Sequence, residues 1–487
     1  MEYSPSEKTV GDLRAEYGTV PVFCEILSDI RTPVEVLSAL MAEDEHCFIL
    51  ESVEDRKRWG RYTIIGFRPE LSIVCSDGDV TVRENGDVRT IAAGHPSDVI
   101  REILGRYRSP TLEGMPPFTG GLVGYFSYDF IKYSEPSLVL DAKDDEGFKD
   151  VDLMLFDKVI VFDNFRQTIS VIVHVNSGRD YQEACAEIRR IVGLIRADGH
   201  RAHPRAVLRS GFRPMYSEEQ YCRMVDQGKE RIREGDIFQV VLSNRLEADF
   251  EGSLLDVYRV LRTTNPSPYM FYLSGTDVEV AGSSPETLVK LSDGVLRTFP
   301  LAGTRPRGTD VDDDRRIEQE LLSDEKECAE HNMLVDLGRN DLGRVSRIGS
   351  VEVERYMEVE RYSHVMHIGS TVAGRIAEGK DAMDAIEAVL PAGTLSGAPK
   401  LKACEIIDGL EDCKRGIYGG AVGYIDFSGD MDVCIGIRLV YRKNGKVFVR
   451  SGAGIVADSV PHNEFMECMN KARAAVEAVE KASEGLE

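Results

Sequence analysis

The chain has 487 residues and carries 59 Lys and Arg residues against 83 Asp and Glu residues, a formal net charge of −24 at pH 7. This length exceeds the size at which a single hydrophobic core usually stops growing, so we expect a large composite domain or two domains sharing an interface. The acidic balance excludes nucleic acid and anionic membrane surfaces as expected partners, because their charge is repelled. An anionic substrate would have to be met by locally placed Arg, Lys, backbone amides or a metal ion.

The cysteines and the N-terminus indicate the compartment. The ten cysteines are scattered singly, without a CxxC pair that would suggest a zinc ribbon or a redox couple, so we interpret them as reduced core thiols. The first residues lack the basic and apolar regions of a signal peptide, and no run approaches 18 apolar residues. We therefore expect a soluble, cytoplasmic protein.

The N-terminal part is predicted to be rich in strands. Residues 47–92 alternate in hydropathy and are interrupted by turn residues, which is typical of an antiparallel meander. Further patterns predict helices at 97–107 and 181–195 and a hairpin that joins 159–162 to 169–175. Residues 198–214 have no apolar period, so we place a boundary there and divide the chain into 1–205 and 206–487.

Helices and strands are mixed in the C-terminal part. Residues 310–314 are predicted to be an exposed loop. Because most strands are joined by tight turns, the predicted fold class is α+β, with large antiparallel β-sheets packed in a sandwich and covered by helices. The predicted helices are 217–234, 254–263, 324–340, 381–390, 400–410 and 461–482, and the predicted strands are 237–242, 269–274, 278–282, 286–301, 421–427, 432–442 and 446–450.

Two predicted helices carry paired acids. Glu327, Glu330 and His331 share one face of helix 324–340, and Glu464 and Glu467 share one face of the last helix with Lys471. Mg²⁺ is commonly held by one or two carboxylates plus substrate oxygens, so each helix could supply one ligand. The alternatives are a solvated acidic face and a surface salt-bridge ladder.

A lone arginine marks a candidate anion site. Arg438 lies on an otherwise uncharged face of the predicted strand 432–442, where its planar fork would suit a carboxylate. Ser451 to Gly454 end the adjoining strand, and glycines let backbone N–H groups approach an anion closely. The alternative is an edge-strand arginine that reaches solvent.

Two further segments carry polar groups without matching a known nucleotide or zinc pattern. Residues 390–402 lack the GK[ST] ending of a Walker A loop, but they can offer amides and hydroxyls to an oxygen-rich ligand. His364 and His367 lack the HExxH pattern of a zincin. One of these histidines could transfer a proton, and the alternative for either is a structural role.

Taken together, these segments resemble the chorismate-utilising enzymes, and most closely the family of anthranilate synthase large subunits. The resemblance covers nearly all of residues 217–482. It rests on seven ordered motifs: PLAGTRPRG (300–308), DEKECAEH (324–331), VDLGRNDLGRV (335–345), SHVMHI (363–368), PAGTLSGAPK (391–400), RGIYGGAVGY (415–424) and GAGIVADSVP (452–461).

The resemblance implies a magnesium site and a chorismate site. Glu330 and Glu467 would hold Mg²⁺, with Glu327 and Glu464 as neighbouring carboxylates. His367 and Thr394 would lie near the reacting ring; His367 is chosen over His364 because the family motif reads VMH. The substrate contacts implied are Gly303, Thr304, Tyr418, Arg438, Gly452, Ala453, Gly454 and Lys471.

The implied reaction has two phases. Ammonia adds at C2 of chorismate as the C4 hydroxyl leaves, and we assign the proton for this leaving group to Glu327. Removal of the C2 proton then expels pyruvate and aromatises the ring, and we assign His367 to this phase.

Two positions separate the members of this family. Aminodeoxychorismate synthases typically have a nucleophilic lysine where this chain has Ala302, and isochorismate and salicylate synthases usually have a water-activating lysine where it has Gln239. Both residues favour ammonia as nucleophile and anthranilate as product. The competing hypotheses are an aminodeoxychorismate synthase and a non-catalytic regulatory subunit that only binds tryptophan.

Regulation and the ammonia source are also implied. The LES and NPSPYM elements resemble the family's tryptophan pocket, so we predict feedback inhibition by L-tryptophan through Ser52, Pro268, Tyr269 and Met270. No amidotransferase region with a nucleophilic cysteine follows the last helix. We therefore expect ammonia to come from a glutamine amidotransferase subunit in a hetero-oligomer.

Overall fold

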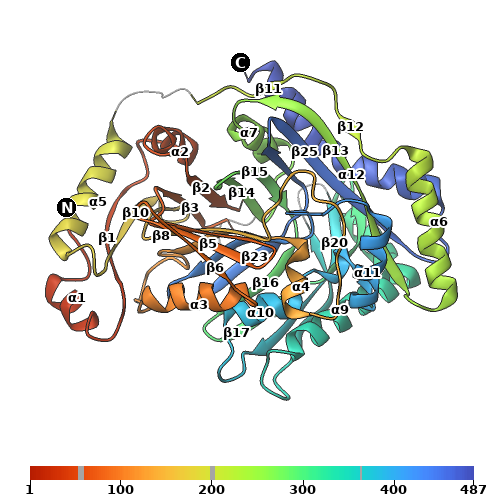
Figure 1. Ribbon diagram of the computed structural model, residues 1–487, viewed down its shortest axis with the longest axis horizontal. Coiled ribbons are helices and arrows are strands. Elements are labelled where there is room, and N and C mark those ends of the chain that lie inside the picture. The colour runs from red at the N-terminus through yellow and green to blue at the C-terminus, as the bar shows by residue number, and fades with distance from the viewer. Residues whose placement is uncertain (53–59, 198–202, 362–364, 487) are drawn as a thin grey trace.

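The computed structural model describes residues 1–52, 60–197, 203–361 and 365–486. Part of the predicted boundary segment, residues 198–202, and the candidate His364 lie outside this range. The described chain forms two large antiparallel sheets with helices around them (Figure 1).

The first sheet has 13 strands among the described residues. Strands β12 (Arg213–Pro214) and β21 (Gly397–Ala398) each pair with β13 beside the main path. That path runs β1 (Val20–Leu27), β10 (Thr168–Val175), β9 (Lys158–Asp163), β3 (Tyr62–Phe67), β2 (Cys47–Glu51), β14 (Tyr269–Ser274), β15 (Glu279–Ser284), β24 (Leu439–Lys443), β25 (Lys446–Ile455), β13 (Gln239–Glu251) and β11 (Val207–Leu208).

The second sheet has 12 strands in the same part of the chain. Strand β19 (Glu352–Arg361) pairs with β20 beside its main path. That path runs β18 (Leu301–Pro306), β20 (Val365–Arg375), β17 (Val295–Thr298), β16 (Thr287–Ser292), β23 (Met431–Ile435), β22 (Ala421–Asp426), β7 (Gly121–Phe126), β8 (Val151–Phe156), β4 (Leu71–Ser76), β5 (Asp79–Glu84) and β6 (Asp87–Ala92).

Aromatic side chains from both sheets meet in one core. Phe48 of β2 lies 4.8 Å, ring centroid to ring centroid, from Phe156 of β8, and both are fully buried. This packing of sheet on sheet confirms the predicted α+β class with a sandwich of antiparallel sheets.

In Figure 1, the helices α6, α11 and α12 lie on one side of the sheets, and α1 and α5 lie on the opposite side. The helices are α1 (Glu7–Leu13), α2 (Pro33–Met41), α3 (Pro96–Arg106), α4 (Ile131–Ser134), α5 (Tyr181–Arg196), α6 (Glu218–Glu234), α7 (Leu255–Thr264), α8 (Val311–Ser323), α9 (Glu325–Gly343), α10 (Ala382–Val389), α11 (Lys400–Leu410) and α12 (Pro461–Glu484), with short 3-10 turns η1 (Tyr128–Phe130) and η2 (Gly393–Leu395).

The N-terminal and C-terminal parts share both sheets. Strand β2 pairs with β14 in the first sheet, and β7 pairs with β22 in the second. The division into 1–205 and 206–487 stays a prediction, and the two parts are continuous through these pairings.

The segment 432–442 was predicted to be one strand, and this prediction is wrong. Strand β23 ends at Ile435 in the second sheet, and β24 begins at Leu439 in the first sheet. The chain crosses between the sheets at Gly436, where a Cβ would lie 2.2 Å from the Ile417 carbonyl oxygen, and Arg438 has a left-handed φ of 52°. The alternation argument for the face of Arg438 therefore fails, because the strand is interrupted there.

The loop predicted at residues 310–314 is also wrong. Asp310 caps α8, and its side chain accepts hydrogen bonds from the backbone N–H groups of Asp312 at 3.0 Å and Asp313 at 2.9 Å. Acidic residues suit the positive end of a helix, so this cluster begins a helix instead of a loop.

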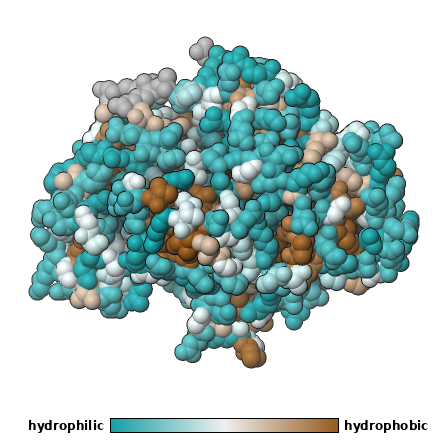
Figure 2. Space-filling view, in the orientation of Figure 1, coloured by the Kyte–Doolittle hydropathy of each residue, from teal (hydrophilic) through white to brown (hydrophobic). Residues whose placement is uncertain are grey.

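The surface agrees with the acidic composition. Figure 2 shows a face that is hydrophilic over most of its area, with apolar side chains exposed in separate patches. Within the described residues, we find no helix that is both long and apolar enough to cross a membrane.

Candidate active site

A cavity of about 710 Å³ lies where the two acidic helices meet the strands β13, β18 and β25. It is large enough to enclose most of a small organic ligand. Its wall includes most of the residues proposed above from sequence: Gly303, Thr304, Glu327, Glu330, Thr394, Tyr418, Arg438, Gly452, Gly454, Glu464, Glu467 and Lys471.

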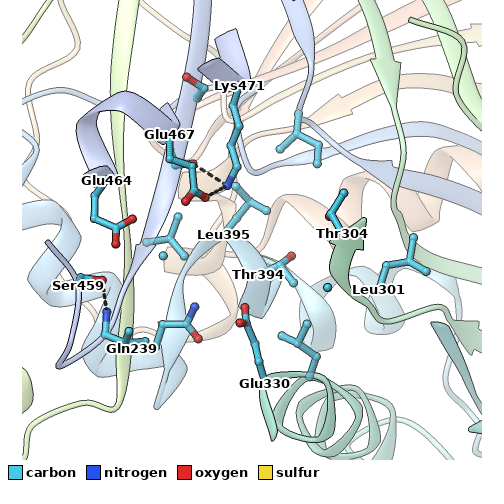
Figure 3. Close-up of a pocket in the computed structure, with 18 of the residues that line it drawn as sticks. Gln239, Leu301, Thr304, Glu330, Thr394, Leu395, Ser459, Glu464, Glu467 and Lys471 are labelled. Carbon is cyan, nitrogen blue, oxygen red and sulfur yellow. Dashed lines mark hydrogen bonds and ion pairs between the residues drawn. The ribbon is translucent and has the colours of Figure 1, made fainter. Parts of the chain in front are cut away.

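Glutamates from two helices face this cavity from different sides. In Figure 3, Glu330 projects from α9, whereas Glu464 and Glu467 project from α12. Withdrawal from bulk water and the charge of Glu327 raise the pKa of Glu330, and burial and Glu467 raise the pKa of Glu464. The cavity therefore collects negative charge that its own cations compensate only in part.

These carboxylates fit a magnesium ion. Among the described residues, three or more His, Cys, Asp or Glu side chains do not converge into a preformed metal site. Mg²⁺ needs no such cage, because it usually binds one or two carboxylates and fills its other positions with water and substrate oxygens. Glu330 and Glu467 provide hard oxygen donors of this kind across an open cavity.

Glu327 is held differently from Glu330. The guanidinium of Arg305 lies 3.1 Å from its Oε1 and 2.9 Å from Oδ2 of Asp324, the residue that caps α9. Glu327 is therefore engaged in an ion pair at the wall of the cavity, and its role as the acid stays a prediction.

Two cations lie beside Glu467. Lys471 forms an ion pair of 2.7 Å with Glu467 and donates to the Gly452 carbonyl at 3.2 Å. Arg438 donates to the backbone carbonyl of Lys471 at 2.6 Å, and burial lowers the pKa of this guanidinium. Arg438 makes no ion pair within the part of the chain that the structure describes, so an anionic ligand would relieve the cost of its burial.

A β-bulge in β18 places Gly303 at the wall of the cavity. The pairing of β18 with β20 shifts register between Ala302 and Thr304, and Gly303 between them has a left-handed φ of 63°. The carbonyl of Gly303 accepts a hydrogen bond of 2.9 Å from Nδ1 of His367. Because a carbonyl only accepts, Nδ1 carries the proton, and Nε2 is the basic nitrogen of the neutral ring.

Gly303→Ala is expected to lower both stability and turnover. A Cβ at this position would lie 2.9 Å from Cδ1 of Leu321 and 3.1 Å from Oε2 of Glu327, and a left-handed alanine costs about 1–2 kcal/mol. Gly349→Ala is the matched control, since its φ is 78° but an added Cβ would meet nothing within 4 Å. Thermal unfolding and turnover of both variants test this, and equal activity in the two would contradict the role of the bulge.

The prediction from sequence missed Glu286. Its carboxylate accepts a hydrogen bond of 3.3 Å from Thr394 Oγ1, and it lines the same cavity. Withdrawal from bulk water raises its pKa to about 7, against the hydrogen bond from Thr394 and the charge of Lys471. Glu286 begins a predicted strand segment as an isolated carboxylate without a partner at helical spacing, so the pattern of paired acids did not indicate it.

Three other residues lie outside the cavity wall or face away from it. His367 touches the wall through Gly303, as described, whereas the side chain of Ala453 packs into a hydrophobic cluster with Tyr221 and Val240. Only the backbone of Ala453 could contact a ligand. His331 is fully buried, hydrogen-bonds Ser370 Oγ at 2.6 Å, and has its pKa lowered by burial to about 4, so its role is structural.

Comparison with known proteins extends these observations to the whole chain. Residues 45–477 match the family described as chorismate binding enzyme. The chain belongs to this family. It is 45% identical to anthranilate synthase component 1 of Acetivibrio thermocellus over 493 aligned residues, which cover 99% of each chain. It is 42% identical to anthranilate synthase component 1 of Aquifex aeolicus, with 100% of both chains covered.

Solved structures of the chorismate-binding enzymes have the same fold. Anthranilate synthase component I from Streptococcus pneumoniae superposes with a TM-score of 0.78 and 37% identity, covering 93% of this chain and 99% of that one. MenF, the menaquinone-specific isochorismate synthase from Escherichia coli, has a TM-score of 0.69 at 17% identity, with 97% of this chain and 98% of that one covered. The second likeness establishes the fold alone.

The two positions expected from the sequence to separate members of this chorismate-binding family lie close to the site. Gln239 lines the cavity, and its amide nitrogen would lie 2.6 Å from a Cβ on Gly454. Ala302 precedes the bulge in β18. Neither side chain can act as a nucleophile or as a base for water.

The predicted tryptophan residues lie on two paired strands. Met270 of β14 pairs with Glu51 of β2, which brings Ser52 to the end of β14 that carries Pro268 and Tyr269. Met270 is buried in the core, and the Tyr269 hydroxyl donates to Oδ1 of Asp432 at 2.7 Å. The four residues are therefore neighbours, and their binding of tryptophan stays a prediction.

Proposed function

We propose that this member of the chorismate-binding enzymes is an anthranilate synthase large subunit, which converts chorismate and ammonia to anthranilate, pyruvate and water. One observation carries the proposal: carboxylates of α9 and α12 and the cations Arg438 and Lys471 face a single cavity. A ligand with two carboxylates and a polar ring fits a cavity that offers both cations and candidate metal ligands.

The two ends of the cavity would orient chorismate. When bound by Glu330 and Glu467, Mg²⁺ would supply positive charge for the ring carboxylate. Arg438 and the backbone N–H groups near Gly452 and Gly454 hold the enolpyruvyl carboxylate. A Cβ on Gly452 would lie 2.8 Å from the Tyr418 hydroxyl, so glycine keeps that hydroxyl close to the ligand's side of the cavity.

Glu286 is the proton donor that the geometry supports best for the first phase. Ammonia attacks C2, and the C4 hydroxyl takes a proton from the Glu286 carboxyl as it leaves as water. A pKa of about 7 keeps a substantial fraction protonated near neutral pH, whereas Glu327 is paired with Arg305. The surplus proton on the added nitrogen returns to a base or to solvent.

His367 serves the second phase. Its neutral ring, with the proton held on Nδ1 by the Gly303 carbonyl, presents Nε2 as a base for the C2 proton. The electrons released aromatise the ring and break the bond to the enolpyruvyl oxygen, so pyruvate leaves. Burial lowers the pKa of His367, which keeps the imidazole neutral and able to accept a proton near neutral pH.

L-tryptophan is proposed as a feedback inhibitor at the end of β2 and β14. Ser52→Leu is expected to keep turnover and to weaken tryptophan inhibition by about ten-fold or more, because it replaces a small hydroxyl with an apolar branch at the site. Measuring turnover against tryptophan concentration tests this. Unchanged inhibition would remove Ser52 from the site.

A glutamine amidotransferase subunit is the proposed source of ammonia, in a hetero-oligomer and in the cytoplasm. The chain itself is tested with ammonium salts. Purified protein with chorismate, Mg²⁺ and ammonium at alkaline pH should release fluorescent anthranilate, and the signal should disappear with a chelator. A folded sample that forms none would reject the proposed function.

A further inference from the structure

A buried group of three charges lies directly behind the cavity. Glu411 follows α11, Arg415 lies four residues later, and Arg450 belongs to β25. Their exposed fractions are 1%, 2% and 2%, so all three are almost completely buried. We call Glu411, Arg415 and Arg450 the buried triad.

Glu411 is the centre of the buried triad. It accepts hydrogen bonds from Arg415 Nε at 2.9 Å and from one Arg450 terminal nitrogen at 2.7 Å. It also accepts from Ser243, through the backbone N–H at 2.7 Å and the hydroxyl at 2.9 Å. Burial alone would raise the pKa of Glu411, but the charges of the two arginines hold it below its ordinary value.

The triad also holds the wall of the cavity. Arg415 donates to the carbonyls of Leu395 at 2.6 Å and Val241 at 2.7 Å, and both residues line the cavity. The ring of Tyr418 lies 5.7 Å from the Arg415 guanidinium carbon and 5.9 Å from that of Arg450, centroid to carbon. The cations therefore lie immediately beneath residues that line the cavity.

The charges in the buried triad do not cancel. Two guanidinium groups share one carboxylate, which leaves one net positive charge at the cavity floor. Arg450 itself forms part of the cavity wall. A buried charge is screened little by salt and acts through a low dielectric, so it attracts an anion more strongly than a surface lysine does.

We propose that the buried triad is a positioning device that uses its net positive charge to bind the dianionic substrate in a chain whose overall charge is −24. It holds Tyr418 and the carbonyls of Val241 and Leu395 in place and offsets the acids on the opposite helices. Its role rests on the proposed function, since the ligand must be a dianion such as chorismate.

The test compares Arg450→Lys with Arg450→Gln in the full chain. Lysine keeps the charge, whereas glutamine keeps hydrogen-bond donors without the charge. We expect KM for chorismate to rise about ten-fold or more in the glutamine variant and by no more than about three-fold in the lysine variant, with kcat changed less than KM. Equal KM values in the two variants would overturn the proposal.

Glu411→Gln separates charge from structure. This variant leaves two buried arginines without a carboxylate, so it should be the least stable of the set, because an unpaired buried charge is strongly destabilising. Its net charge is higher, so it should bind chorismate at least as tightly as the wild type. A loss of binding that follows the loss of stability would mean that the triad is only structural.

Arg179→Gln is the control for an ion pair that is remote from the site. Arg179 lies 3.2 Å from Glu70 and also pairs with Asp157, and none of the three lines the cavity. The Arg179→Gln variant should have a lower melting temperature than the wild type and the same KM for chorismate. If the wild type itself does not turn over chorismate, the proposed function fails; if it does and charge at position 450 has no effect on KM, only this inference fails.

Discussion

Replacing Glu286 with glutamine is expected to lower anthranilate formation by about 10²–10⁴-fold, the usual contribution of a positioned general acid. Glutamine has nearly the same shape and can still accept the hydrogen bond from Thr394, but it cannot deliver a proton to the leaving hydroxyl. Chorismate binding should therefore change little. Steady-state kinetics with ammonium, with binding measured separately by calorimetry, tests both halves of this expectation.

The pH dependence of kcat/KM is a second test of Glu286 as the acid. Glu286 acts as an acid only when protonated, and its pKa is about 7, so kcat/KM should fall as pH rises through this value. Free ammonia must be held constant across the series, because its concentration also changes with pH. The fall should disappear in Glu286→Gln, and an unchanged profile would contradict the assignment.

Glu327→Gln is the matched comparison for the acid. Its carboxylate faces the same cavity but is paired with Arg305 at 3.1 Å. If Glu327 only supports the site, its substitution should cost less than that of Glu286. A larger loss of activity in Glu327→Gln than in Glu286→Gln would instead support Glu327 as the acid, as predicted from the sequence.

Glu330→Gln is expected to abolish turnover and to stabilise the metal-free protein. Glutamine is a poor substitute for a carboxylate ligand of Mg²⁺, so the Mg²⁺ concentration needed for thermal stabilisation should rise by about 10–100-fold. Without metal, withdrawal from water and the charge of Glu327 raise the pKa of Glu330, so its ionised form costs folding free energy above that pKa. Removing the charge should therefore raise the melting temperature at pH 8.

The sign of that stability change is the discriminating result. A group whose pKa is raised on folding stabilises the protein at low pH, and this contribution is lost as pH rises through the folded-state pKa. The gain from Glu330→Gln should thus be present at pH 8 and vanish near pH 4. Glu325→Gln, on the exposed first turn of the same helix, serves as control and should change neither property.

Much of the fold could be predicted because its signals are local. The helical spacing of Glu327, Glu330 and His331 predicted α9 to within three residues of its observed end at Gly343. Alternating hydropathy with turn residues predicted β4, β5 and β6 in the same way. What periodicity could not predict was the sheet to which each strand belongs.

The crossover at Arg438 illustrates that limit. Residues 432–442 alternate as one strand would, yet they divide between two sheets because Gly436 packs against the Ile417 carbonyl. That contact depends on a residue distant in sequence. The triad of Glu411, Arg415 and Arg450 was missed for the same reason, since β25 meets the end of α11 only in the folded chain.

The acidic helix pair shows what the family resemblance added. Spacing alone predicted that Glu327 and Glu330 share a face, but for an acidic helix taken by itself a solvated surface was the favoured interpretation. The structure places both in one cavity with Glu467 of α12, which supports the proposed metal site.

The most direct test of the central claim is the identity of the product formed with ¹⁵N-labelled ammonium, chorismate and Mg²⁺. Mass spectrometry and NMR should find ¹⁵N-anthranilate, with nitrogen at the carbon next to the ring carboxylate, and pyruvate in equal amount. Nitrogen at C4, as in an aminodeoxychorismate, or an unlabelled hydroxylated product such as isochorismate would contradict the account.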